Sequence, residues 1–257
     1  MISKQQIKAI HSLRLKKYRD QRGLFVGEGP KVVGELLHTF ECTFVAATAS
    51  WIEANRQIIP AGIPCETVQP EELAKASLLE TPQQVLAIFR QKENTLPTDS
   101  ALQSELCLAL DTVQDPGNLG TILRLARWFG INYVICSPGT ADIYSPKVVQ
   151  AAMGALGKVS VGYTPLPQYL SGIPADIPVY GTFLDGTNIY DTPLSYRGII
   201  VMGNEGNGIS QLTASHVTHR LYIPPYPAGT PTIESLNVGV ATAITCAEFR
   251  RRANTNS

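Results

Sequence analysis

The chain has 257 residues, 44% of them hydrophobic and 16% charged, an ordinary composition for a globular protein of one large or two modest domains. Its N-terminus lacks the apolar core of a signal peptide, and no apolar run approaches the ~18 residues of a membrane-spanning helix. Five scattered cysteines without a C-x-x-C pair argue against a disulfide framework or a zinc cluster. We expect a cytoplasmic protein with free thiols and no membrane partner.

The formal net charge of zero hides an uneven distribution. Residues 1–35 hold eight Lys and Arg against three acids, so this part carries +5 and the remainder −5. Such a split predicts a basic arm that binds the phosphates of a polyanion through Lys4, Lys8, Arg14, Lys16, Lys17, Arg19 and Arg22. The alternative is that these bases form the solvent-exposed face of an amphipathic helix. Its apolar face would then consist of Ile2, Ile7, Ile10 and Leu13.

The first part of the chain predicts a small α/β domain over residues 1–90. Strand and helix patterns alternate in four segments: 25–37, 42–55, 70–77 and 84–90. Pro70 stands where a helix favours proline, at its first position. The polar, proline-bearing stretch 91–105 has no periodicity and predicts a linker.

A second alternation fills residues 106–257. Strands are predicted at 105–111, 132–137, 158–163, 178–183, 198–203 and 220–224. Helices are predicted at 118–129, 146–155, 166–170, 209–215 and 235–251. Continuous apolar strands alternating with helices indicate a largely parallel sheet that is covered on both faces.

Candidate ligand-binding segments follow these strands, because parallel sheets bind ligands beyond the carboxyl ends of their strands. The segments are DTVQDPGNLG, LDGTNIY, NEGNGIS and PYPAGTPTIESLN. No phosphate-loop, dinucleotide-binding or nucleophile-elbow motif is present, which disfavours the common nucleotide hydrolases, dinucleotide enzymes and α/β-hydrolases. His216 and His219 lack a third ligand, so no metal site is expected.

The helix expected to start at or near Asn118 places arginines beside a strand end. Its apolar arc would face the core, and Asn118 would cap its N-terminus. Arg124 and Arg127 lie on the polar side, where guanidinium groups suit phosphate recognition. The alternative is an ordinary amphipathic helix with surface arginines.

Three segments in order resemble the motifs of the SpoU/TrmH family, RNA ribose 2′-O-methyltransferases of the SPOUT class: DTVQDPGNLGTILRLARWFGI, VMGNEGNGIS and IPPYPAGTPTIESLNVGVATAITCAEFRRR. The resemblance spans about residues 106–252, and 25–37 resembles the N-terminal RNA-binding domain of the rRNA-directed branch. It implies S-adenosylmethionine as methyl donor, a trefoil-knotted SPOUT architecture, an RNA substrate and a homodimer.

The resemblance also implies roles for particular residues. The catalytic set is Arg124, Asn118, Glu205, Ser235 and Asn237, with Arg124 as the family's proposed catalytic residue. The donor-binding set is Thr182, Leu184, Gly203, Asn204, Gly206, Ile223 and Leu236, with a loop at 182–186 closing the pocket. Arg127 joins the seven N-terminal bases as a candidate RNA contact.

Several positions depart from the family pattern. Gly239 replaces a small polar residue, and Gln150 and Ala152 stand where Arg and Ser are common, which weakens one RNA-facing contact. The loop at 224–233 is longer and richer in proline than usual. We expect 2′-O-methylation of rRNA, because the N-terminal domain favours it. The alternatives are the same reaction on tRNA and a catalytically silent RNA-binding protein, which the retained catalytic set disfavours.

Overall fold

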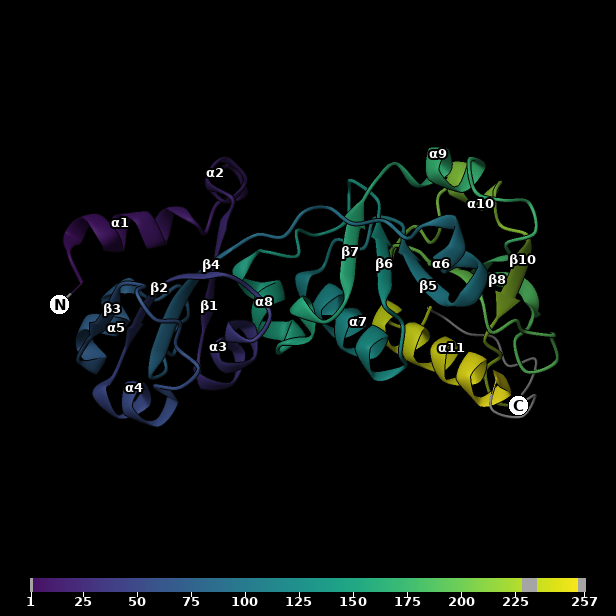
Figure 1. Ribbon diagram of the computed structural model, residues 1–257. Coiled ribbons are helices and arrows are strands. Elements are labelled where there is room, and N and C mark those ends of the chain that lie inside the picture. The colour runs from purple at the N-terminus through teal and green to yellow at the C-terminus, as the bar shows by residue number, and fades with distance from the viewer. Residues whose placement is uncertain (1, 228–234, 254–257) are drawn as a thin grey trace. The chain divides into compact units, whose positions relative to one another are not determined.

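The computed structural model describes residues 2–227 and 235–253 (Figure 1). The chain forms two compact units, the first of residues 1–93 and 142–158, the second of residues 94–141 and 159–257. The first unit is therefore discontinuous: the segment 142–158, which the sequence placed in the second domain, packs with the N-terminal residues. Within the described part of the chain, no helix is long and apolar enough to cross a membrane.

A four-stranded mixed sheet in the order β1-β4-β2-β3 forms the centre of the first unit. Its strands are β1 (Leu24–Glu28), β2 (Cys42–Ala47), β3 (Cys65–Thr67) and β4 (Val85–Arg90). The strand β4 runs antiparallel to β1 and β2, and β3 runs parallel to β2. The predicted strand and helix segments are confirmed, while the exposed, polar β3 had no apolar pattern to predict it.

The helices of the first unit cover this sheet. They are α1 (Lys4–Ser12), α2 (Lys16–Arg22), α3 (Pro30–Leu37), α4 (Ala49–Asn55), α5 (Pro70–Ala76) and α8 (Pro146–Ala152), with the 3-10 helix η1 (Ala155–Gly157). The helix α1 begins at a capping box, in which Ser3 and Gln6 satisfy each other's backbone N–H groups. Its apolar side chains Ile10 and Leu13 are fully buried, so the helical spacing read from the sequence is correct.

A six-stranded sheet in the order β10-β8-β9-β5-β6-β7 forms the centre of the second unit, and all its neighbouring strands pair in parallel. Its strands are β5 (Leu106–Leu110), β6 (Tyr133–Cys136), β7 (Ser160–Tyr163), β8 (Val179–Asn188), β9 (Gly198–Met202) and β10 (His219–Tyr222). The strands β5 and β9 are buried along their whole length. The predicted parallel α/β fold is confirmed.

The helices of the second unit are α6 (Asp99–Ser104), α7 (Pro116–Trp128), α9 (Leu166–Ser171), α10 (Gln211–Ala214) and α11 (Val238–Ala253). In Figure 1, α11 lies alongside α7, and Arg250 of α11 donates hydrogen bonds to the carbonyls of Phe129 and Gly130 just beyond α7. These carbonyls lie at a helix end and lack a partner within the helix, so Arg250 stabilises both the helix end and the packing of the two helices.

Two sequence predictions need correction here. The helix α7 begins at Pro116, and its cap is Asp115, whose carboxylate accepts a hydrogen bond from the Asn118 N–H at 2.8 Å. Asp followed by Pro is the stronger start signal, so Asn118 lies inside the first turn and is not the cap. The predicted linker 91–105 contains α6, which Thr98 caps and whose Leu102 is fully buried.

Candidate active site

Four strand ends bring the motif segments together. The strands β10, β8, β9 and β5 are consecutive neighbours and parallel, so their carboxyl ends lie along one edge of the sheet. The first motif follows β5, the 182–186 segment lies in β8, the NEG segment follows β9, and the last motif follows β10. Segments separated by up to about 120 residues therefore meet at this edge, as parallel strand order requires.

An amide–carboxylate cluster joins the three motifs. Glu205 Oε1 accepts hydrogen bonds from the Nδ2 groups of Asn118 and Asn237, the latter at 3.1 Å. Asn237 Nδ2 also reaches Asn118 Oδ1 at 3.0 Å, and Ser235 Oγ donates to the Glu205 carbonyl at 3.4 Å. Four residues of the predicted catalytic set thus share one network, and Glu205 holds Asn118 in place.

Asn237 has a second function, as the cap of α11. Its Oδ1 accepts hydrogen bonds from the N–H groups of Gly239 at 2.9 Å and Val240 at 3.2 Å. The helix therefore begins at Val238, three residues later than predicted, and Ser235 and Asn237 precede it. One side of the Asn237 amide caps the helix while the other side contacts the first two motifs, so the helix start fixes the cluster.

Arg124 does not join this cluster. It is exposed on α7, and among the described residues its guanidinium has no hydrogen-bond or ion-pair partner. At 3.6 residues per turn it lies about 120° around the helix from Asn118. The opposite face of α7 anchors the helix through Leu119, Ile122, Leu123 and Ala126, all fully buried. Arg124 and the neighbouring Arg127 on the same polar side can therefore meet a ligand or a partner.

Residues 182–186, which the sequence predicts to close the donor pocket, form an excursion from a strand. Consecutive residues of β10, Arg220 and Leu221, pair with Gly181 and Thr187 of β8, so residues 182–186 leave the ladder between them. The Arg220 guanidinium lies 3.5 Å from the Phe183 ring centroid and 2.5 Å from Asp185 Oδ1. The hydrogen bond from Arg220 lowers the pKa of Asp185. Arg220 therefore holds the excursion through two contacts, one with an aromatic ring and one with a carboxylate.

The turn after β9 is folded tightly on itself. A Cβ at Gly203 would overlap the backbone of Gly208, so only glycine fits there. Asn204 Oδ1 accepts from the Gly206 N–H at 2.9 Å, and its Nδ2 donates to the Thr112 carbonyl at 2.8 Å. Asn204 thus shapes its own turn and ties it to the first motif.

The predicted donor set combines exposed apolar side chains with a tight glycine turn. Thr182 Oγ1 lies 3.9 Å from Met202 Sδ, which places the excursion beside the end of β9. Leu184 and Leu236 are 73% and 48% exposed, unusually open for leucines at a sheet edge. Such side chains suit the apolar faces of an adenine, and the backbone groups of the glycine turn suit its polar edges. A neighbouring pocket of about 390 Å³ is lined by Val113, Gln114, Asp115, Pro116, Asn204, Glu205 and Gly206.

Sequence reasoning missed Asp111 and Thr112, which connect the first motif to the rest of the site. The buried Asp111 Oδ2 accepts from Ser210 N–H at 2.9 Å and Ser210 Oγ at 2.7 Å, joining β5 to the start of α10. Thr112 has φ of 61°, a left-handed conformation that is rare for a β-branched residue. The sequence signal that could have identified Asp111 is an acidic residue directly after a buried strand.

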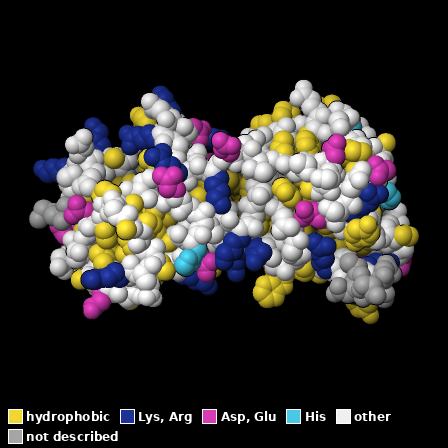
Figure 2. All heavy atoms as spheres, viewed as in Figure 1, with side chains coloured by type: hydrophobic (Ala, Val, Ile, Leu, Met, Phe, Trp, Pro, Cys, Tyr) yellow, Lys and Arg dark blue, Asp and Glu magenta, His cyan; other side chains and the backbone are white. Residues whose placement is uncertain are grey.

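The basic arm divides into exposed and buried members. Lys4, Lys8, Arg14, Lys16, Lys17 and Arg22 are exposed, and Figure 2 shows Lys and Arg side chains over α1 and α2. Arg19 is only 3% exposed and forms an ion pair with Asp142, so it is not open to a phosphate. We remove Arg19 from the candidate RNA contacts. Periodicity could not reveal this, because the acid that pairs with Arg19 is 123 residues away.

The two departures in α8 have structural roles. Gln150 Nε2 donates to the Glu28 carbonyl at 2.7 Å, and Ala152 is fully buried. Glu28 itself is buried, and the loss of hydration raises the pKa of its carboxyl despite hydrogen bonds from Ser77 and Leu78. No group of three or more potential metal ligands occurs in the parts of the chain that the structure describes.

Comparison with known proteins agrees with this geometry. The model of the SpoU rRNA Methylase family matches residues 105–247, and the MRM3-like substrate binding domain matches residues 4–87. The chain is 32% identical to the 23S rRNA (guanosine(2553)-2′-O)-methyltransferase RlmP of Bacillus subtilis, over 93% of this chain and 94% of that protein.

Two solved structures are similar over nearly the whole chain. One is described as an RNA methyltransferase of the TrmH family from Porphyromonas gingivalis, with 42% identity, a TM-score of 0.87, and 98% of this chain and 99% of that chain covered. The other is an AdoMet-bound rRNA methyltransferase from Sinorhizobium meliloti, with 27% identity, a TM-score of 0.83, and coverage of 98% and 96%.

Proposed function

Because the chain belongs to the SpoU rRNA methylase family, we propose that it transfers the methyl group of S-adenosylmethionine to a ribose 2′-oxygen of ribosomal RNA. The observation that carries this proposal is the network of Asn118, Glu205 and Asn237, which unites the three family motifs at one edge of the sheet. A catalytically silent RNA-binding protein would have no need to keep these residues in mutual contact.

The N-terminal unit supports rRNA over tRNA as substrate. Residues 4–87 match a substrate-binding domain, and the similar proteins RlmP and the Sinorhizobium meliloti enzyme are both named for rRNA. The six exposed bases of α1 and its neighbours supply the charge for phosphate contacts, which position an RNA without reading its sequence.

The reaction depends more on the alignment of the 2′-oxygen with the methyl group than on acid–base catalysis. When bound, the donor supplies an electrophilic sulfonium methyl group. Holding the 2′-oxygen in line with that group can contribute on the order of 7 kcal/mol to the lowering of the barrier. A guanidinium is effectively never neutral, so Arg124 cannot act as the base. Its role is to orient the ribose or its phosphate and to stabilise the developing oxyanion.

Glu205 acts as a positioning group in this scheme. One of its oxygens already accepts from two amides, Asn118 and Asn237. These hydrogen bonds tie the carboxylate to the first and the last motif. Glu205 therefore keeps the loops of the first and last motifs in register while Arg124 acts on the RNA.

We further propose that the predicted donor-binding set holds S-adenosylmethionine and that the second unit contains a trefoil knot. We also propose that the protein is cytoplasmic and forms a homodimer. A two-fold dimer through α7 and α11 is supported by exposed apolar side chains on these helices, Trp128 at 83% and Val240 at 49%. The small residues Gly239, Ala241 and Ala243 of α11 permit close approach of another element. A Cβ added at Gly239 would lie 3.4 Å from Thr121 Cγ2 of α7 in the same chain. Sedimentation at micromolar concentration should give about twice the chain mass of 27.8 kDa.

The proposed activity is tested with radiolabelled methyl donor and ribosomal RNA. Methylation of a 2′-oxygen makes the adjacent phosphodiester resistant to alkali, so label should appear in alkali-resistant dinucleotides. Label in base-modified nucleotides, or labelling of tRNA alone, would contradict the proposal. Mapping ribose methylation in cells that lack the gene would then identify the nucleotide.

A further inference from the structure

The segment 142–158 is an integral part of the first unit, although it lies inside the region that matches the methylase family. The ring of Tyr144 lies 4.8 Å from that of Phe25 in β1. A Cβ at Gly154 would overlap Glu35 of α3, and one at Gly157 would overlap Thr39. The backbone of this segment is therefore pressed against α3 and the residues after it, and the first unit is incomplete without it.

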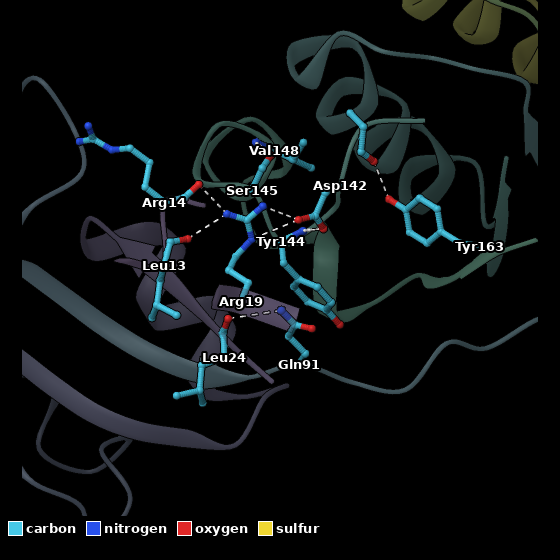
Figure 3. Close-up of polar contacts among 11 residues, drawn as sticks. Leu13, Arg14, Arg19, Leu24, Gln91, Asp142, Tyr144, Ser145, Val148 and Tyr163 are labelled. Atoms are coloured by element: carbon cyan, nitrogen blue, oxygen red, sulfur yellow. Dashed lines mark hydrogen bonds and ion pairs between the residues drawn. The ribbon is translucent and has the colours of Figure 1, made fainter. Parts of the chain in front are cut away.

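Arg19 of α2 connects this segment to the basic helices (Figure 3). Its Nη2 and Nε donate to Asp142 Oδ2 at 2.5 and 3.1 Å. Its Nη1 donates to the carbonyls of Leu13 and Arg14, at 2.8 and 2.7 Å, in the turn between α1 and α2. Asp142 is itself oriented, since its Oδ1 accepts from the Tyr144 N–H at 2.9 Å. One buried guanidinium thus fixes the turn of the proposed RNA-binding helices to Asp142.

The residues directly before Asp142 hold the first motif. Ala141 N–H donates to the Val113 carbonyl at 2.9 Å, and Ser137 Oγ accepts from Thr112 N–H at 2.8 Å. Tyr163 Oη donates to the Ala141 carbonyl at 2.5 Å. Ala141 and Asp142 are joined by a peptide bond. The bonds of the first unit thus end at Asp142, and those of the second unit begin at Ala141, its neighbour in the chain.

We propose that Arg19 and Asp142 are positioning residues that couple RNA engagement by the α1–α2 region to the first-motif turn. This inference rests on the proposed function. In this proposal Arg19 contacts neither RNA nor donor: it holds Asp142, whose neighbour in the chain, Ala141, holds the backbone at Val113. Disrupting the pair should slow methyl transfer in the bound complex while leaving most RNA affinity in place, because the exposed bases remain.

The test compares Arg19→Met, Asp142→Asn and the double variant under single-turnover conditions, with donor and rRNA fragment saturating. Both single variants should slow at least about tenfold, while their RNA Kd changes by less than about threefold. The double variant should be no slower than the slower single variant, because both changes break the same interaction. Arg19→Lys retains the charge and should recover part of the rate. If Arg19→Met fails to fold, Arg19→Lys replaces it in the comparison.

The matched control is Arg90→Met, which breaks an exposed Arg90–Glu41 pair of the same unit. It should keep the wild-type rate. Variants with a lowered Tm but a wild-type rate at saturation would overturn the coupling and leave Arg19 a purely structural residue. A raised RNA Kd with an unchanged saturated rate would overturn it too. An inactive wild-type protein would instead refute the proposed function.

Discussion

Glu205 accepts hydrogen bonds from two asparagines that are 119 positions apart in the sequence. Each asparagine also contributes to a helix start: Asn118 gives its N–H to the cap of α7, and Asn237 caps α11. The carboxylate therefore links two helix N-termini, where negative charge is favourable. This arrangement explains why a single acid at the end of β9 can organise loops from three motifs.

Replacing Glu205 separates positioning from proton transfer. Glu205→Gln keeps one acceptor oxygen for the two amides, so we expect the rate of methyl transfer to fall by no more than about tenfold. Glu205→Ala removes the acceptor and should reduce the rate substantially more. A general base would behave differently, because its removal typically slows a reaction by about 10²–10⁴-fold. A Glu205→Gln rate reduced to that extent, together with a changed pH–rate profile, would make Glu205 the base.

Glu248 predicts a pH dependence of stability. Hydrogen bonds and ion pairs with Arg251 and Arg252 lower the pKa of this buried carboxyl to about 2. Its folded pKa is below its unfolded value, so the stabilisation is present above about pH 4.5 and is lost as the pH falls towards 2. Arg251 is largely exposed, so solvent screening makes the effect small.

The measurement is urea unfolding of Glu248→Gln against wild type. The variant should be less stable at pH 7, and the difference should shrink steadily below pH 4.5, the ordinary pKa of the carboxyl. A difference that is constant down to the lowest pH at which the protein stays folded would contradict the ion-pair explanation.

At the residue scale the sequence could predict which residues form the amide–carboxylate cluster, but not which residue pairs with which. The motif pattern placed Asn118, Glu205, Ser235 and Asn237 in one site, and their hydrogen bonds join them there. It assigned the α7 cap to Asn118, because the stronger Asp115–Pro116 signal was overlooked. It counted Arg19 among the RNA contacts, because the burial of a charge depends on a distant acid that no local pattern reveals.

At the element scale, the most consequential feature is the excursion of residues 182–186 from β8. In a regular strand these residues would pair with β10. Here they leave the pairing and lie at the proposed donor site. Gly186 is required where the excursion returns, because a Cβ there would approach the backbone of Leu221 to 2.5 Å. Arg220 holds the excursion through Phe183 and Asp185.

Removing Arg220 should therefore weaken donor binding. The ion pair is exposed and contributes little, but the cation–π contact is worth about 0.5–1 kcal/mol at such a site. We expect Arg220→Met to raise the calorimetric Kd for S-adenosylmethionine by about twofold to fivefold, with little change in rate at saturating donor. Arg197→Met, which breaks the Arg197–Asp176 pair of the same unit, is the matched control. Equal Kd values for both variants would show that the excursion does not contact the donor.

The elements that the sequence predicted are those with an apolar pattern. The six strands of the second unit carried such patterns, as did its helices α7, α9, α10 and α11, and all six strands pair in parallel as expected. The strand β3 is largely exposed and has no apolar pattern, and α6 is a six-residue helix with one fully buried leucine, so neither carried a periodic signal. The expected start of the last helix was early because Asn237 acts as cap.

At the scale of the whole molecule, positive charge is concentrated in residues 1–35. The six exposed bases of the N-terminal arm should bind phosphates without reading bases. Replacing Lys8, Lys16 and Lys17 with glutamine should weaken binding to all rRNA fragments alike. It should also reduce the slope of log affinity against log salt by about 0.7–0.9 for each phosphate that the variant no longer neutralises. An unchanged slope in filter binding would place the RNA on another surface.

The segment 142–158 is where whole-molecule organisation departed most from the sequence prediction. Chain continuity assigned it to the second domain, but its glycine turns and Tyr144 pack within the first unit. Local patterns predicted the helix at 146–155 and could not predict which core it would join, because that depends on contacts between distant residues.

Methyl transfer by Arg124→Ala tests the proposed catalysis more directly than any other variant. The arginine is exposed and unpartnered among the described residues, so its removal should leave folding and donor binding nearly intact. Its contribution belongs to the transition state, so the rate should fall by at least about 100-fold with donor and rRNA saturating. The measurement is single-turnover transfer of labelled methyl groups to ribose 2′-oxygens of rRNA. We expect a nearly inactive variant that still binds donor and RNA; a rate close to wild type would contradict the catalytic role of Arg124.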